Sequence, residues 1–172
     1  DTTIIPNILP SDIASDFVLN QGVGNTFVGG TTTVSAEAAT TMTLADTFYD
    51  VAGTFTATDL QHFDSPSTGQ LRHLGTNPRE FRLFADLTVK SGANDVITVR
   101  GLRWDNSTST FIEAGRQTRE VNSLVGIRNV AFFNATFGVV LDENDYLKLQ
   151  VSSDDTNAVT IENSSFYTLA TR

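Results

Sequence analysis

The chain has 172 residues, a formal net charge of −9, an apolar fraction of 40% and no cysteine. This length suits a single domain that buries its own core, and the lack of cysteine excludes disulfides and thiol catalysis. The negative charge argues against nucleic-acid binding, and no apolar run approaches the roughly 20 residues that span a bilayer. We therefore expect one domain that neither binds nucleic acid nor inserts into a membrane.

Residues 1–34 differ from the rest and are predicted to form an extended N-terminal arm. Pro6 and Pro10 hold the residues before them in extended conformations, and the glycines and threonines that follow suggest turns. Four large aliphatic residues cluster around these prolines, namely Ile4, Ile5, Ile8 and Leu9. Because a solvated tail rarely keeps such a cluster, we predict that the arm docks on a partner. A frayed tail or an ordinary first strand is the alternative.

Residues 35–172 are predicted to form one β-sandwich domain, because turn signals recur about every 8–12 residues. The clearest strand is Glu80–Lys90, where apolar residues occupy every second position and Phe84 alone is apolar on the other face. Further strands are predicted at Thr43–Val51, Thr54–Leu60, Leu71–His73, Val96–Trp104, Thr108–Ala114, Arg116–Val121, Ile127–Leu141, Tyr146–Val151, Ala158–Glu162 and Ser165–Ala170. We find no helical pattern in this region. Many short antiparallel strands favour a jelly roll of two packed sheets.

The two histidines, His62 and His73, lie in a loop-rich stretch and are the candidates for general-base chemistry. The acids and hydroxyls near them in sequence are Asp59, Asp64, Ser65 and Ser67. A Ser-His-Asp site would need one member of each kind in contact, and the sequence has no nucleophile elbow. We therefore predict no catalytic residue and no enzymatic activity.

Two acidic turns, Asp142–Asp145 and Asp154–Asn157, carry enough oxygen ligands to raise the question of a Ca²⁺ site. Neither matches the EF-hand loop, and Asp and Asn are ordinary residues of tight turns, so we predict turns and no metal ion. We find no glycine-rich phosphate motif and predict no cofactor. Trp104 and Tyr49 could form a sugar-stacking surface, although packing in a core or an interface is the favoured interpretation.

From about Thr43 to the C-terminus, several segments resemble the TNF/C1q-like jelly-roll modules of bacteriophage virion proteins in order and spacing. The matching segments are Thr47–Thr54 (TFYDVAGT), Gly75 followed by Phe81–Thr88 (FRLFADLT), Asn94–Val99 with Trp104-Asp105-Asn106 downstream, Leu141–Val151 (LDENDYLKLQV) and Ser165–Leu169 (SFYTL). Asn144 stands where the family usually has glycine. Such modules decorate capsids or form fibre tips, so the resemblance implies a structural role on the exterior of a virion.

The resemblance also implies a homotrimer, because three jelly rolls of this class pack around a threefold axis through one sheet. The residues support this independently. Phe84 faces away from the core side of its strand, and in the pairs Phe132-Phe133 and Phe166-Tyr167 only one ring of each can enter the core. We predict that Phe84, Phe132 and Tyr167 form the trimer interface. Cover of this face by the arm of the same chain is the alternative.

The leading interpretation is a non-enzymatic phage protein, a homotrimeric capsid decoration or head-fibre protein. Its arm residues Ile4, Ile5, Ile8 and Leu9 would tie the trimer to the major capsid protein or to another virion protein. The alternative is a receptor- or carbohydrate-binding tip of a tail fibre or baseplate, with a host surface glycan as its partner. A secreted bacterial C1q-like adhesin is a third interpretation.

Overall fold

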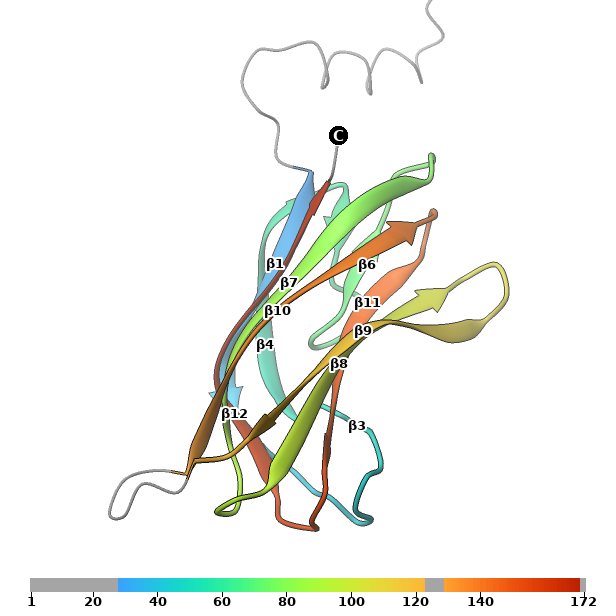
Figure 1. Cartoon of the computed structure of the whole chain (residues 1–172). Coiled ribbons are helices and arrows are strands. Elements are labelled where there is room, and N and C mark those ends of the chain that lie inside the picture. Colours follow the sequence, from blue (N-terminus) through green and yellow to red (C-terminus); the bar gives the residue numbers. More distant parts are fainter. Residues whose placement is uncertain (1–27, 123–128, 171–172) are drawn as a thin grey trace, which may run out of the picture.

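The computed structural model describes residues 28–122 and 129–170, which form two antiparallel β-sheets and no helix (Figure 1). These residues accordingly contain no helix of the length and apolarity that crossing a bilayer requires. The strands are β1 (Gly29–Glu37), β2 (Ala39–Thr40), β3 (Tyr49–Asp50), β4 (Gly53–Gln61), β5 (Phe63–Asp64), β6 (Leu71–His73), β7 (Arg79–Lys90), β8 (Val96–Asp105), β9 (Thr110–Glu120), β10 (Val130–Leu141), β11 (Tyr146–Ser153) and β12 (Val159–Ala170).

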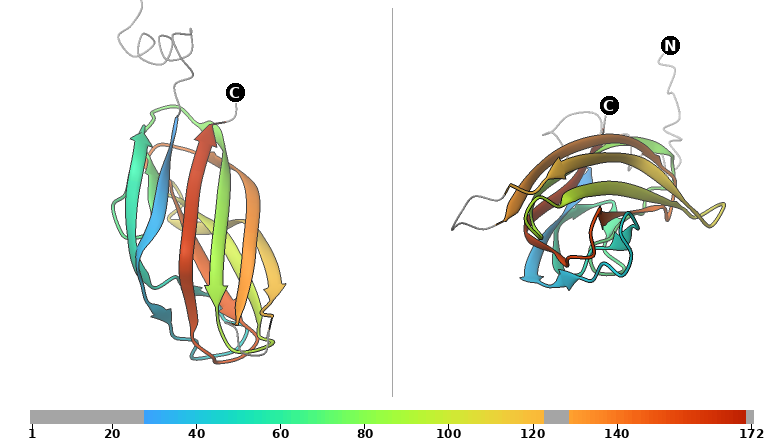
Figure 2. Two further views of the ribbon diagram at one scale, coloured as in Figure 1. Left: turned by 90° about the vertical axis from the view of Figure 1, so that its left-hand side faces the viewer. Right: turned by 60° about the horizontal axis from the view of Figure 1, so that its bottom comes forward.

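The strands divide into two sheets that stack face to face (Figure 2). The first sheet has the order β10-β7-β12-β1-β4, with β2 beside β12, and the second has the order β5-β6-β11-β8-β9, with β3 beside β11. From β7 onward the chain crosses between the sheets at every connection except the β8–β9 hairpin. The prediction of an all-β, antiparallel jelly roll is confirmed.

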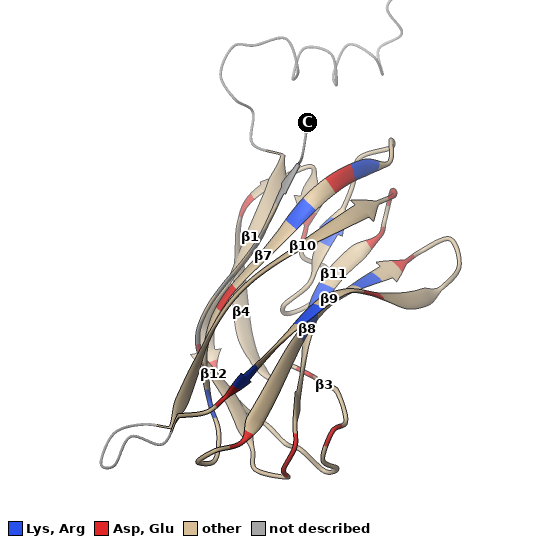
Figure 3. Ribbon diagram, in the orientation of Figure 1, with Lys and Arg blue, Asp and Glu red and all other residues tan. Residues whose placement is uncertain are grey.

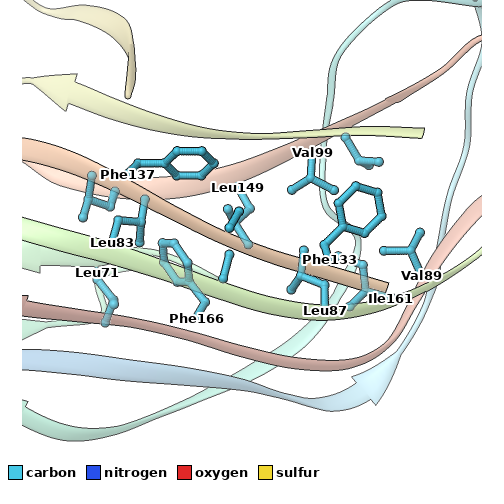
Figure 4. Close-up of a cluster of buried hydrophobic side chains, with 14 of the residues drawn as sticks. Leu71, Leu83, Leu87, Val89, Val99, Phe133, Phe137, Leu149, Ile161 and Phe166 are labelled. Atoms are coloured by element: carbon cyan, nitrogen blue, oxygen red, sulfur yellow. The ribbon is translucent and has the colours of Figure 1, made fainter. Parts of the chain in front are cut away.

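The core follows from the two-residue period of the long strands. In β7 the buried side chains are Phe81, Leu83, Ala85, Leu87 and Val89. In β10 they are Ala131, Phe133, Ala135, Phe137, Val139 and Leu141. Figure 4 shows aromatic rings of the first sheet lying among aliphatic side chains of the second. Apolar burial between the sheets is therefore what the alternating pattern of these strands produces.

Gly101 and Gly115 face each other across β8 and β9 and make room for one core ring. A Cβ atom added at Gly115 would lie 2.2 Å from Cδ1 of Phe137, and one added at Gly101 would lie 2.8 Å from Cδ2 of Leu83. Real Cβ atoms essentially never approach another heavy atom within 3.0 Å. Glycine at position 115 is thus required by the close approach of Phe137, and a side chain at position 101 would be crowded first by Leu83 and then by Phe137.

Three predicted boundaries differ from the structure. Thr43–Val51 was expected to be one strand, but only Tyr49 and Asp50 pair with β11, because Asp46 turns the chain with a φ of 56°. The two strands expected around Gly115 are the single strand β9, and the two expected around Asn163 are the single strand β12 with an irregularity before that residue. In the last two cases a residue type that usually interrupts a strand, glycine at 115 and asparagine at 163, lies within a continuous strand.

The sandwich begins earlier than the boundary expected between 1–34 and 35–172. β1 already pairs with β12 and with β4 at Gly29. Gly30 fits there because a Cβ atom would lie 2.9 Å from Cδ2 of Leu60, and the β-branched threonines that follow suit a strand. Residues 29–34 therefore belong to the sheet. The rest of the expected arm, residues 1–27, lies outside the described residues and stays a prediction.

Candidate functional site

The outer face of β10 is uncharged and carries two exposed apolar side chains. Its outward side chains are Phe132, Asn134, Thr136 and Val140, and Gly138 lies among them. Phe132 is 70% exposed and Val140 is 47% exposed, whereas Phe133 is buried, so the expected alternation of the two phenylalanines is confirmed. Figure 3 shows no charged residue on β10, while acidic residues gather in loops at the lower end of the view.

The other two predicted interface residues belong to the same sheet. Phe84 of β7 is half-buried and pairs in register with Tyr167 of β12 and with Thr136 of β10. Phe132 is four residues from Thr136, which places it about 13 Å along the sheet from that row. The side chain of Tyr167 lies outside what the structure describes. The structure therefore brings positions 84 and 167 side by side, and their role in a trimer stays a prediction.

The arm residues cannot be placed on this face. Ile4, Ile5, Ile8 and Leu9 lie outside the described residues. Their docking on a capsid or another partner therefore stays a prediction.

The histidine-containing stretch is held by structural contacts. His73 is only 2% exposed and packs against the rings of Phe63 and Phe81, with centroids 5.4 and 5.1 Å away. Asp64 accepts a hydrogen bond from Nε of Arg72 at 2.8 Å. His73 is thus packed in the core, and Asp64 forms an ion pair with Arg72. These two residues do not form part of a Ser-His-Asp site.

We expect the protein to lose stability as the pH falls through about 6.5, the ordinary pKa of histidine. Burial is the main cause that lowers the pKa of His73, and the hydrogen bond with the Asp142 carbonyl opposes it. Between its folded and unfolded pKa, the unfolded chain binds a proton that the folded chain does not, so stability falls by up to about 1.4 kcal/mol per pH unit in this window.

Urea midpoints at about pH 7.5 and about pH 5.5 test this expectation. The midpoint should fall at the lower pH for the unchanged chain and for a His62→Gln control, and much less for His73→Gln. An equal fall in His73→Gln would assign the effect to another group.

The acidic turn between β10 and β11 is held by an arginine. Nε of Arg103 donates to Oδ2 of Asp145 at 2.7 Å, and Nη2 donates to Asp142 at 3.1 Å. Asp145 is fully buried and also accepts the backbone N–H of Asn106 at 2.9 Å. Asn144 has a φ of 67°, which asparagine tolerates in place of the glycine usual at this turn. The buried carboxylate of Asp145 therefore joins the turn between β10 and β11 to the turn that follows β8.

The acidic turn between β11 and β12 is likewise tied to its neighbours. Asp154 accepts the backbone N–H of Val96 at 2.8 Å, and the Asn157 side chain donates to Asp95 at 3.1 Å. Within the described residues, no three or more His, Asp or Glu side chains are grouped so that they could hold a metal ion. Both acidic turns thus have structural roles.

An aromatic cluster of Trp104, Phe111 and Tyr146 lies on the outer face of the second sheet, on the opposite side of the sandwich from Phe132. The rings of Trp104 and Tyr146 are stacked with centroids 5.8 Å apart, and Phe111 packs edge-on against Trp104 at 4.8 Å. Phe111 is 43% exposed and the other two are half-buried. Three neighbouring strands thus bring aromatic rings together on a partly exposed surface, a composition that suits contact with a ligand ring.

A polar network runs beside the aromatic cluster across the same sheet. Asp50 accepts hydrogen bonds from Lys148 and Gln150, each at 2.7 Å, and Gln150 in turn accepts from Arg100 at 2.6 Å. Arg100 also pairs with Glu113 at 3.4 Å. Burial raises the pKa of Asp50, but the bonds from Lys148 and Gln150 outweigh it and hold the pKa below its usual value. The carboxylate is thus charged at neutral pH and is held in place by these bonds.

Sequence reasoning paired Trp104 with a different tyrosine. The OH of Tyr49 bonds instead with Oγ1 of Thr43 at 2.6 Å, while Trp104 packs on Phe111 and Tyr146. The outward positions of Trp104 and Tyr146 on their strands could have indicated the cluster, but the register between strands was needed to bring the three rings together.

Neither a protein-family model nor a curated protein sequence matches this chain. Among solved structures, the chain is similar to Eiger TNF from S. frugiperda, with a TM-score of 0.62 and 11% identity over 85% of this chain and 93% of that one. It is also similar to murine APRIL at pH 8.0, with a TM-score of 0.57 and 7% identity over 82% of this chain and 98% of that one. At these identities the likeness shows the fold alone, a TNF-like jelly roll.

Proposed function

We propose that this chain is a non-enzymatic structural protein of a phage particle that works as a homotrimer on the exterior of the particle. The observation that carries the assembly is Phe132, a large aromatic side chain 70% exposed on an uncharged strand. Exposed aromatic surface of this kind favours burial against a partner. The proposed partner is a second and a third copy of the chain, and the virion setting is supported by the segments that resemble phage jelly-roll modules.

The proposed mechanism is cohesion. Burying one phenylalanine side chain contributes about 1.5–3 kcal/mol before the costs of association, and a trimer buries three copies of Phe132. The apolar arm residues Ile4, Ile5, Ile8 and Leu9 would attach the trimer to the capsid or to another virion protein. The net charge of −9 would keep neighbouring particles apart.

Phe132→Asp tests the assembly. Light scattering after size exclusion should give three times the chain mass of 18.6 kDa for the unchanged protein and the mass of one chain for Phe132→Asp, because a carboxylate cannot be buried cheaply at the interface. Phe111→Asp is the matched control, since Phe111 is an exposed phenylalanine on the opposite sheet. A monomeric unchanged protein, or a trimeric Phe132→Asp variant, would overturn the proposal.

Antibody labelling of purified particles tests the location. Label on the capsid supports decoration, whereas label at the tip of a tail fibre or baseplate supports the alternative role. Particles that carry a chain lacking residues 1–20 should lose the label, because the arm provides the attachment; retained label would rule out that attachment.

The second candidate function is recognition of a receptor or a host glycan by a tail-fibre tip. The aromatic cluster favours it, because Trp104 and Tyr146 offer a stacked surface beside the fixed hydrogen-bonding groups of Asp50 and Gln150. This cluster lies on the sheet that the proposed trimer leaves uncovered.

A further inference from the structure

A pocket of about 110 Å³ opens between the two sheets, beside β1, β4, β11 and the loop before β6. It exists because the second sheet is incomplete there. β11 pairs with β6 at Tyr146 and Leu147 and with β3 at Gln150 and Val151, so the ladder on this side is interrupted at the two residues between them.

Thr32 lies in this pocket with an unused hydrogen-bonding group. Its side chain is fully buried, and its Oγ1 has no hydrogen-bond partner among the described residues. The neighbouring buried hydroxyls are used, since Thr168 accepts the N–H of Gly30 at 3.1 Å and Ser164 accepts the N–H of Val34 at 2.9 Å. A buried hydroxyl without a partner is costly, so its place in a pocket points to a ligand that supplies one.

The walls and mouth of the pocket define the ligand. Phe55 and Phe166 supply apolar surface, and Gln70 supplies an amide. Asp50 and Lys148 line the same pocket and neutralise each other through hydrogen bonds of 2.7 and 2.8 Å. A water molecule takes about 30 Å³, so the pocket has room for a group of several heavy atoms. The ligand that fits is therefore small and neutral and carries hydroxyl groups.

One residue, Lys148, lines the pocket and contacts the aromatic cluster. Nζ of Lys148 lies 4.3 Å from the ring centroid of Phe111, and the same side chain reaches Asp50 in the pocket. Lys148 therefore connects the pocket with the cluster that the glycan-binding candidate uses. Sugars combine apolar ring faces with hydroxyl groups, which suits a pocket lined by Phe55, Phe166 and the Thr32 hydroxyl.

We propose that the pocket binds the hydroxyl-bearing arm of a neutral monosaccharide, with Oγ1 of Thr32 as its innermost hydrogen-bonding partner. The proposal rests on the glycan-binding candidate and is independent of trimer formation. A failed sugar titration would contradict only the glycan-binding proposal, and a monomeric mass would contradict only the proposed trimer.

Saturation-transfer NMR on the full chain tests the proposal, with glycerol and methyl β-D-glucopyranoside as probes. Both should receive saturation from the unchanged protein and from Thr32→Ser, which keeps the hydroxyl. Thr32→Val, which keeps the shape and removes the hydroxyl, should bind at least about fivefold more weakly. Thr33→Val is the matched control, since Thr33 lies on the other face of β1, and it should bind as the unchanged chain does.

Three outcomes would overturn the proposal. The first is no transfer to either probe from the unchanged protein, and the second is equal binding by Thr32→Val. The third concerns stability without a probe, where Thr32→Val should raise the urea midpoint because an unpartnered hydroxyl is removed from the interior. A lowered midpoint would mean that the hydroxyl already has a structural partner, such as a bound water.

Discussion

Asp145→Ala is expected to lower the free energy of unfolding by about 3–5 kcal/mol, the cost of breaking a buried ion pair. The Asp145 carboxylate is fully buried and accepts hydrogen bonds from Arg103 at 2.7 Å and from the backbone N–H groups of Asn106 and Asp142 at 2.9 and 3.0 Å. Without it, two N–H groups lose their partner, and the largely buried guanidinium of Arg103 loses the shortest of its ion pairs. Urea denaturation measures the change in stability.

Asp142→Ala is the matched control. Asp142 pairs with the same arginine, but its side chain is 46% exposed, so its removal should cost less than about 1 kcal/mol. Replacing the pair together, by Asp145→Leu with Arg103→Met, should recover only part of the loss. The buried guanidinium then no longer lacks its main partner, but Asp105 and Asp142 lose their ion pairs with Arg103. If Asp145→Ala proved no more harmful than Asp142→Ala, the buried pair would not be what holds these loops.

Gly115→Ala is expected to cost about 1–3 kcal/mol through overpacking. The added methyl carbon would lie 2.2 Å from Cδ1 of Phe137 and 2.8 Å from its Cε1, and this ring is enclosed between the sheets. Phe137→Leu in the same chain should relieve the contact, so the double variant should lose less than the two single variants combined. Thermal or urea unfolding of the three variants measures this.

Gly138→Ala provides the control on β10. A Cβ atom at Gly138 meets nothing within 4 Å, so this variant should be neutral or more stable by up to about 1 kcal/mol. Equal losses in Gly115→Ala and Gly138→Ala would show that the glycines matter for backbone conformation and not for space.

Strand faces could be predicted from this sequence, whereas strand ends could not. The alternation in β7 predicted which side chains are buried, and Phe132 lies outside and Phe133 inside as expected. Breaks were expected at Gly115 and near Asn163, because glycine and asparagine usually end strands. Gly115 is present for Phe137, which is 22 positions later in the chain, and no local pattern carries that information.

A candidate site could be predicted from the sequence only where its residues lie on a single strand. The outward direction of Phe132 needs a single strand, whereas the aromatic cluster needs the register of three strands to join Phe111 with Tyr146. Thr32 stood in a run of threonines that suggested a turn. Its burial follows from pairing with β12, more than a hundred residues away. A buried hydroxyl without a partner at this position therefore could not be predicted from the local sequence.

The position of β12 in the first sheet decides when the chain can fold. β12 comes after the other described strands in the chain, yet it lies between β7 and β1 and supplies pairing partners to both. Until it leaves the ribosome, two long strands keep open edges, which are prone to pair with other chains. The first sheet is therefore completed only after residues 159–170 have left the ribosome, and contacts as distant as Gly29 with Leu169 make folding slow for a domain of this size.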